Sequence, residues 1–141
     1  MDKIYNIYEN IQEKGYKLTV PRKVILEVLI DNKDFLLEPV EIFEKVLKIN
    51  KNINFSTIYR NLEIFLNIGI LRRISLEDGK NGYQIILDEG HTHCLICKKC
   101  GRVEPLQTCP FEKLDMTIFE TKGFLPESHK FEVYGLCKNC L

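Results

Sequence analysis

Two cysteine pairs near the C-terminus constrain this chain more than any other feature of its sequence. All six cysteines lie after residue 93, and four of them form the Cys-x-x-Cys pairs Cys97/Cys100 and Cys137/Cys140. Each pair can offer two thiolates from one tight turn, and the two pairs together match the tetrahedral coordination that zinc prefers. The spacing therefore predicts a structural zinc site that ties the end of the chain back to Cys97.

Reduced structural cysteines or a redox pair are the alternatives to zinc. A thioredoxin-like redox motif should open a helix after a strand near the N-terminus, and neither pair has that context. In a cytoplasmic chain, such spacing indicates metal binding rather than disulfides.

The composition indicates a cytoplasmic globular protein. A hydrophobic fraction of 45% in 141 residues supports packed cores. The N-terminus does not resemble a signal peptide, and no span approaches transmembrane length, so we expect no membrane partner. The formal net charge is +0, and residues 1–82 carry 13 Lys and Arg against 12 Asp and Glu. Nucleic-acid binding therefore has to be argued from a motif and not from total charge.

The first 87 residues predict helices followed by a β-hairpin. Apolar residues recur at helical spacing in four segments. The first segment ends at Gly15, the second begins at Thr19 and Pro21, the third opens at Glu38-Pro39, and the fourth runs from Asn54 or Ser56 to Gly69. Two β-rich runs, 70–74 and 83–87, flank a turn rich in Gly, Asp and Asn. This order is the pattern of a winged-helix domain.

The composition changes near Asp88-Glu89-Gly90, because every His and Cys lies beyond that point. We therefore predict a winged-helix domain over residues 1–87 and a metal-binding domain over residues 88–141. The second domain is expected to combine short strands, including one over 129–134, with one helix from about Pro110 to Lys122. The predicted fold class is α+β.

The fourth predicted helix carries residues suited to reading DNA. Thr57, Tyr59, Arg60 and Glu63 lie away from its apolar stripe. A recognition helix presents its N-terminal residues to the major groove, where Arg pairs with guanine or phosphate and an aromatic ring touches a thymine methyl group. A solvated helix face is the alternative, and the residue types alone do not exclude it.

Several stretches of the chain resemble the ferric uptake regulator family, including its zinc uptake regulators. They are Gly15–Arg22, Ser56–Leu62, His91–Gly101 and the tail from Gly123 through His129 to Cys140. The resemblance covers nearly the whole chain in order. Members of the family are dimeric, metal-activated repressors, so it implies a homodimer that binds double-stranded operator DNA and has no small-molecule substrate.

The resemblance also implies roles for individual residues. Tyr59 and Arg60, with Thr57 beside them, would contact the major groove. Lys17 would reach an A·T-rich minor groove, and Arg22, which closes the same motif, is expected to contact DNA as well. Cys97, Cys100, Cys137 and Cys140 match the structural zinc ligands of the family.

A regulatory metal site within the second domain is implied by four further positions. The family uses a His six residues before the first paired Cys, a His or Asp four residues before it, a Glu on the following helix and a His ahead of the last pair. This chain supplies His91, His93, Glu112 and His129, and these include all of its three histidines. Three imidazoles and one carboxylate suit zinc, which we expect as the regulatory metal, with Fe(II) as the alternative.

The second regulatory site of the family, at the hinge between the domains, departs from the pattern. Its usual histidine positions hold Thr92 and Cys94. Either the site is lost, or it is rebuilt around Cys94 and Cys109 with Asp88 or Glu89 as oxygen ligands. Buried thiols without a ligand role are the alternative.

The expected function is metal-gated repression, and the expected protein is not an enzyme. An iron-dependent or peroxide-responsive regulator of the same family is one alternative. A zinc hydrolase is another, because His91, His93 and His129 could hold a catalytic zinc with Glu112 as base. The winged-helix motif and the four paired cysteines argue against the hydrolase.

Overall fold

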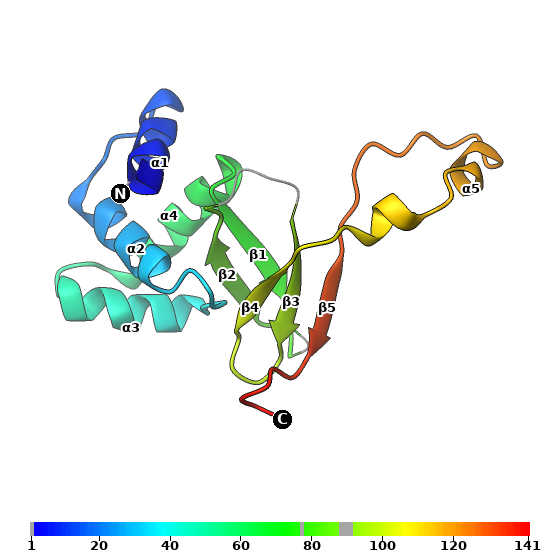
Figure 1. The fold of residues 1–141 in the computed structure, drawn as a ribbon. Coiled ribbons are helices and arrows are strands. Elements are labelled where there is room, and N and C mark those ends of the chain that lie inside the picture. The colour runs from blue at the N-terminus through cyan, green and yellow to red at the C-terminus, as the bar shows by residue number, and fades with distance from the viewer. Residues whose placement is uncertain (1, 77, 88–91) are drawn as a thin grey trace. The chain divides into compact units, whose positions relative to one another are not determined.

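The computed structural model describes residues 2–76, 78–87 and 92–141, and it has the α+β fold class that the sequence predicts. The chain forms two compact units, Met1–Glu89 and Gly90–Leu141 (Figure 1). The boundary predicted after residue 87 lies two residues before this division. No helix in the described part of the chain is both long and apolar enough to cross a membrane.

The first unit begins with helices α1 (Asp2–Glu13), α2 (Val20–Asp31), α3 (Pro39–Ile49) and α4 (Phe55–Asn67). Their ends follow from local sequence. The Thr19 hydroxyl accepts a hydrogen bond from the backbone N–H of Arg22 and caps α2. After α4 the chain turns at Gly69, whose φ of 82° lies in the left-handed region that favours glycine.

A β-hairpin follows α4, as the sequence predicts. Strand β1 (Leu71–Ser75) pairs antiparallel with β2 (Asn81–Ile85). The second strand starts at Asn81 instead of the predicted residue 83, because the register pairs Ser75 with Asn81. Leu37 adds an isolated bridge to Tyr83, with reciprocal backbone hydrogen bonds of 2.9 and 2.8 Å. This bridge ties the segment before α3 to the hairpin and was not visible in the sequence pattern.

One apolar core holds the first unit together. It contains eighteen buried residues contributed by all four helices and the hairpin. Ile58, Leu62 and Phe65 lie fully buried on one face of α4. Burial of each such side chain stabilises the fold by about 1.5–3 kcal/mol. The opposite face of α4 is thereby fixed toward solvent.

The second unit contains a three-stranded sheet in the order β4-β3-β5. Strand β3 (His93–Cys97) pairs antiparallel with β4 (Val103–Leu106) and parallel with β5 (Glu132–Gly135). Between β4 and β5 lie a one-turn 3-10 helix, η1 (Pro110–Lys113), and the short helix α5 (Thr117–Glu120). The strand predicted over 129–134 begins only at Glu132.

The single helix predicted from Pro110 to Lys122 is wrong. The backbone is extended at Leu114, with φ −77° and ψ 143°, which ends η1. The Asp115 carboxylate then accepts a hydrogen bond from the backbone N–H of Thr117 at 3.0 Å. An Asp that bonds the backbone two residues ahead favours a new turn over helix continuation.

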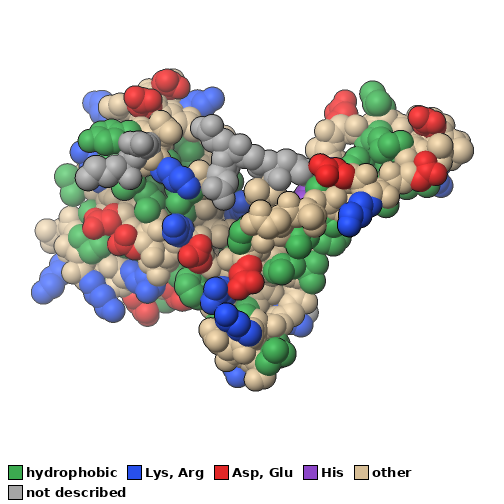
Figure 2. Space-filling view, viewed as in Figure 1, with side chains coloured by type: hydrophobic (Ala, Val, Ile, Leu, Met, Phe, Trp, Pro, Cys, Tyr) green, Lys and Arg blue, Asp and Glu red, His purple; other side chains and the backbone are tan. Residues whose placement is uncertain are grey.

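The segment around α5 exposes apolar side chains, some of which are visible in Figure 2. The exposed residues are Leu114, Met116, Ile118, Phe124 and Leu125. Exposed apolar patches of this kind mark surfaces that another molecule covers.

Candidate metal centres and DNA-binding surface

The two Cys-x-x-Cys pairs meet because β5 runs parallel to β3. The register places Gly135 opposite Cys97, and the backbone N–H of Lys98 donates to the Gly135 carbonyl at 2.8 Å. Each pair then closes a tight turn. The Gly101 N–H donates to the Cys97 carbonyl in the first, and the Cys140 N–H donates to the Cys137 carbonyl in the second. Two turns on neighbouring strands thus present their sulfurs to one another.

The four sulfurs lie within 4.8 Å of one another. The Sγ atoms of Cys100 and Cys137 are 3.8 Å apart. Four sulfurs placed tetrahedrally around zinc at about 2.3 Å are separated by about 3.8 Å. The donor set and its spacing therefore fit a closed four-thiolate zinc site.

The protonation of these thiols is already perturbed. Hydrogen bonds from the backbone N–H groups of Cys100 and Cys137 lower the pKa of Cys97 to about 6. Cys140 differs, because its side-chain hydrogen bond with Cys137 raises its pKa to about 12. A bound divalent cation would deprotonate its thiol ligands. The difference in protonation between Cys97 and Cys140 would then disappear.

A second group of donors converges elsewhere in the same unit. It consists of His93 at the start of β3, Cys109 just before η1 and His129 ahead of β5. The Nε2 atoms of the two histidines are 3.1 Å apart, and the Cys109 sulfur lies 3.2 Å from His93 Nε2 and 3.1 Å from His129 Nε2. His93 and Cys109 are buried, with 4% and 8% of their surfaces exposed.

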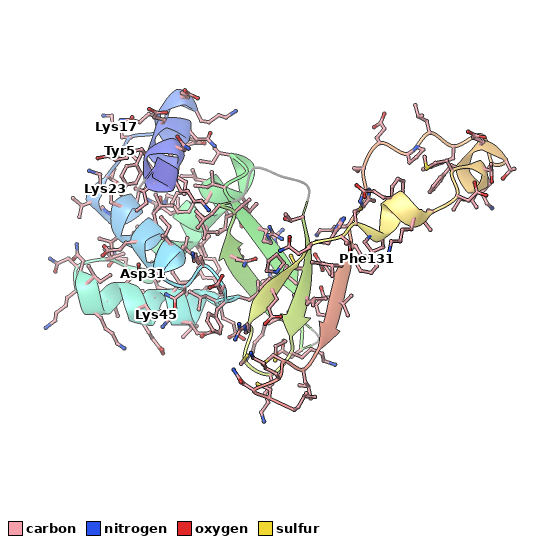
Figure 3. The ribbon with its side chains drawn as sticks, in the orientation of Figure 1. Tyr5, Lys17, Lys23, Asp31, Lys45 and Phe131 are labelled. Atoms are coloured by element: carbon pink, nitrogen blue, oxygen red, sulfur yellow. The ribbon has the colours of Figure 1, made fainter. Side chains whose placement is uncertain are left out.

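Aromatic rings hold the imidazoles of this group in place. The Phe111 ring stacks on the His129 ring at 4.3 Å between centroids, with an interplanar angle of 5°. Phe131, labelled just ahead of β5 in Figure 3, meets His93 edge to face at 6.0 Å. These contacts restrain the orientations of the two imidazole rings.

The exposed face of α4 presents the residues suited to DNA. Tyr59 is 45% exposed and Arg60 is exposed, and Thr57 is partly exposed. The Phe55 ring supports Tyr59 edge to face, with 5.1 Å between ring centroids. The helix thus carries an exposed aromatic ring and an exposed guanidinium group.

Lys17 and Arg22 lie near the start of α2 but are used differently. Lys17 is exposed on the connection between α1 and α2 (Figure 3). The Arg22 guanidinium turns toward its own chain. It donates to Asn61 Oδ1 of α4 at 2.9 Å and to the Lys17 carbonyl at 2.7 Å, and it lies over the Tyr16 ring at 5.4 Å.

Comparison with known proteins decides the family. A family model described as "Ferric uptake regulator family" matches residues 13–134. The chain belongs to the ferric uptake regulator family. Proteins of this family are metal-responsive transcription regulators that bind DNA as dimers, and they are not enzymes. The hydrolase alternative is therefore wrong.

Individual relatives agree with this membership. The ferric uptake regulation protein of Staphylococcus aureus is 32% identical over 131 residues, with 92% of each chain covered. A structure of a zinc-bound manganese uptake regulator matches with a TM-score of 0.71 and 31% identity over 92% of this chain and 96% of that chain. The Francisella tularensis ferric uptake regulator with iron matches with a TM-score of 0.72 and 31% identity over 89% of this chain and 95% of that one.

The structure brings two of the predicted regulatory residues of this family member together and places another apart from them. It brings His93 and His129 together, whereas Glu112 is exposed on η1 and is not among the described donors that converge there. Cys109, which we assigned to a possible hinge site, occupies the third position of the group. His91 lies outside the described residues, as do Asp88 and Glu89.

Cys94 does not join Cys109. Neighbouring strand residues point to opposite faces, so Cys94 lies on the face of β3 opposite His93, where it is buried. Strand alternation in the sequence could have placed Cys94 on the face opposite His93. Nothing local in the sequence predicted that Cys109 would meet two histidines that lie far from it along the chain.

Proposed function

We propose that the protein is a metal-gated repressor that binds palindromic double-stranded operators as a homodimer. The observation that carries the proposal is the group His93, Cys109 and His129, which is a second convergent donor set separate from the four cysteines. The four-cysteine site is closed and suits a structural role. The second site can then gain and lose metal while the four-cysteine site keeps the domain folded. We propose that the protein acts in the cytoplasm, where operator DNA is accessible.

The proposed DNA contacts come from the first unit. Arg60 would pair with guanine or phosphate, and Tyr59 and Thr57 would touch thymine methyl groups in the major groove. Lys17 would reach the minor groove. We propose that Arg22, which we expected to contact DNA, instead fixes Lys17 relative to α4, because its guanidinium bridges the Lys17 carbonyl and Asn61.

The proposed homodimer uses the second unit. β5 is an edge strand of the sheet, and apolar side chains there remain exposed in the isolated chain. They include Phe131, Val133 and Leu136, which are 37%, 43% and 52% exposed. Edge strands with apolar side chains invite pairing with another chain, and a second copy provides a matching strand.

The metal would act by selecting one arrangement of the dimer. Two recognition helices read a palindrome only when their spacing matches that of the half-sites. Metal bound between β3, the segment before η1 and the segment before β5 would stabilise one conformation of the second unit. If that conformation sets the half-site spacing, the metal shifts the population toward the DNA-competent state.

We propose zinc for both sites, bound by Cys97, Cys100, Cys137 and Cys140 in one and by the histidine-containing group in the other. Imidazole and thiolate donors favour zinc over harder ions. Fe(II) remains the second candidate, because imidazoles also bind iron and a similar structure is that of a ferric uptake regulator with iron.

The test is operator binding titrated against buffered free Zn(II) and, anaerobically, Fe(II). The operator would be a duplex selected from a random library by the zinc-loaded protein. The wild-type protein should bind only above a threshold of free zinc, and His129→Ala should lose this dependence while keeping one zinc per chain. Activation by Fe(II) but not by zinc would make the protein an iron regulator. Binding that ignores both metals would overturn the proposal.

A second arm tests the recognition helix. Arg60→Ala should weaken operator binding by about 1–3 kcal/mol, the value of one good bidentate contact, with folding and metal content unchanged. Arg102→Ala is the control, because Arg102 is a partly exposed arginine of the second unit that pairs with Glu104. Equal affinities for the two variants would remove Arg60 from the reading surface.

A further inference from the structure

We infer that Cys109 is a thiolate ligand of the regulatory metal, together with His93 and His129, in the position that we expected Glu112 to fill. The regulatory role of this site rests on the proposed function. Metal binding by Cys109 stands apart from that role, because it can be measured without DNA.

The spacing of the three donor atoms supports a common cation. The two nitrogens are 3.1 Å apart, and each lies 3.1–3.2 Å from the sulfur. Around a tetrahedral zinc with usual bond lengths, two nitrogens are separated by about 3.4 Å and a nitrogen and a sulfur by about 3.6 Å. The three side chains would need to open by only a few tenths of an ångström to hold the ion.

Hydrogen bonds alone do not account for the triangle. Each imidazole Nε2 is either a donor or an acceptor, and a thiol has a single proton. Whatever tautomers are chosen, two sides of the triangle at most can carry a hydrogen bond. The third side then has no proton of its own to share, although its two atoms are equally close. A cation that accepts electron pairs from all three atoms accounts for all three short distances.

The surroundings favour Cys109 over Glu112 as a ligand. Cys109 is 8% exposed and lies beside His93, which is 4% exposed. Glu112 is exposed on the next turn, where its carboxylate is solvated. The stacked Phe111 ring fixes the His129 imidazole, so the donor group is held in place by apolar packing.

A thiolate changes which metals the site prefers. Replacing carboxylate oxygen by sulfur makes the donor set softer, which favours Zn(II) and Co(II) over Mn(II) and Fe(II). Cys109 would therefore be the residue that sets the metal specificity of the site.

The experiment uses Co(II) as a spectroscopic substitute for zinc. The full-length protein, with one zinc per chain retained in the four-cysteine site, is titrated with Co(II) under anaerobic conditions. We expect a near-ultraviolet band from thiolate-to-cobalt charge transfer that saturates at one equivalent. Elemental analysis must show that the first zinc stays bound, so that the band reports only the second site.

Four variants identify the sulfur. Cys109→Ser should lose the charge-transfer band and weaken zinc binding by about 100-fold or more, since even outer-shell changes cost 10–100-fold. Cys94→Ser, which removes the other buried thiol outside the Cys-x-x-Cys pairs, and Glu112→Gln should keep the band. Cys109→Asp should restore cobalt binding without the band and should raise the affinity for Mn(II) relative to Zn(II).

Several results would overturn the inference. A band that persists in Cys109→Ser, or that disappears in Cys94→Ser, would assign the sulfur elsewhere. Absence of any second cobalt site would mean that the triad is only hydrogen-bonded. If Cys109 binds metal but operator affinity does not respond to it, the proposed function fails while this inference stands.

Discussion

The two units of the chain are stabilised by different means. The first unit buries a single cluster of eighteen apolar side chains, with Phe65, Leu62 and Ile58 fully enclosed. Among the described residues of the second unit, only six are buried, and they are His93, Cys94, Ile96, Cys97, Val103 and Cys109. Three of these six belong to the two groups of potential metal donors.

The two units therefore differ in what they require in order to fold. We expect the apolar core to stabilise the first unit without a metal ion. The second unit has about fifty residues, a size at which metals or oligomerisation commonly supply missing stability. Its donor groups and exposed apolar segments fit that need. A unit that folds around metal is also a unit whose conformation metal can control.

The largest expected effect is the loss of the structural zinc. Cys140→Ser should release the metal, unfold the second unit and abolish the dimer, because structural zinc contributes about 10–16 kcal/mol in small domains. The helices of the first unit should persist. Elemental analysis, sedimentation and far-ultraviolet circular dichroism measure the three quantities.

Cys94→Ser is the control for that change, because Cys94 is a cysteine of the same unit, on β3, outside both donor groups. It should keep both the zinc and the dimer. If Cys140→Ser remains dimeric with a full complement of zinc, the four-cysteine assignment is wrong. If the first unit melts with the second, the contrast between the units fails.

A core substitution in the first unit should give the converse pattern. Phe65→Ala removes a fully buried ring and should lower the free energy of unfolding of that unit by about 3–5 kcal/mol. Zinc content and dimerisation through the second unit should be unchanged. Tyr5→Ala, at a ring that is 63% exposed (Figure 3), should change stability by less than about 0.5 kcal/mol. Loss of zinc in Phe65→Ala would show that the two units do not fold independently.

The contrast also explains how much could be predicted from sequence. Helical periodicity, the Thr19 cap and the turn at Gly69 are local signals, so the helices and hairpin of the first unit were anticipated. In the second unit the apolar pattern is sparse. Asp115 starts a new turn where a single helix was expected, and the apolar periodicity of the segment gave no sign of that break.

The candidate sites also differ in how far they could be predicted from sequence. The spacing inside each Cys-x-x-Cys pair is local, so each pair could be identified from sequence as a source of two zinc ligands. The meeting of Cys109 with His93 and His129 depends on the path of the chain between β4 and β5, which no short-range pattern encodes. The sequence also left open that Arg22 would turn inward, because its partner Asn61 is 39 residues away.

The smallest expected effect concerns this polar link in the first unit. Arg22→Lys keeps the charge but loses the paired hydrogen bonds to Asn61 and the Lys17 carbonyl. It should lower the free energy of unfolding by about 1–3 kcal/mol and weaken DNA binding with an unchanged salt dependence.

Lys17→Ala should instead reduce the slope of log affinity against log salt by about 1, as expected when one cationic side chain no longer displaces counterions from the DNA. Fluorescence anisotropy at several salt concentrations separates the two effects. A further variant, Arg22→Ala, removes the charge as well. If it lowered the slope of log affinity against log salt and left the free energy of unfolding unchanged, Arg22 would contact DNA directly and would not position Lys17.

If metal in the second unit controls DNA binding by the first, zinc binding and operator binding must be reciprocally linked. Zinc affinity of the regulatory site is measured by chelator competition in the dimer, with and without saturating operator. Allosteric coupling of about 1–3 kcal/mol corresponds to a 5–150-fold change, and it must be equal in both directions. We predict that operator raises zinc affinity by the same factor by which zinc raises operator affinity. Zinc affinity that is identical with and without operator would contradict the account.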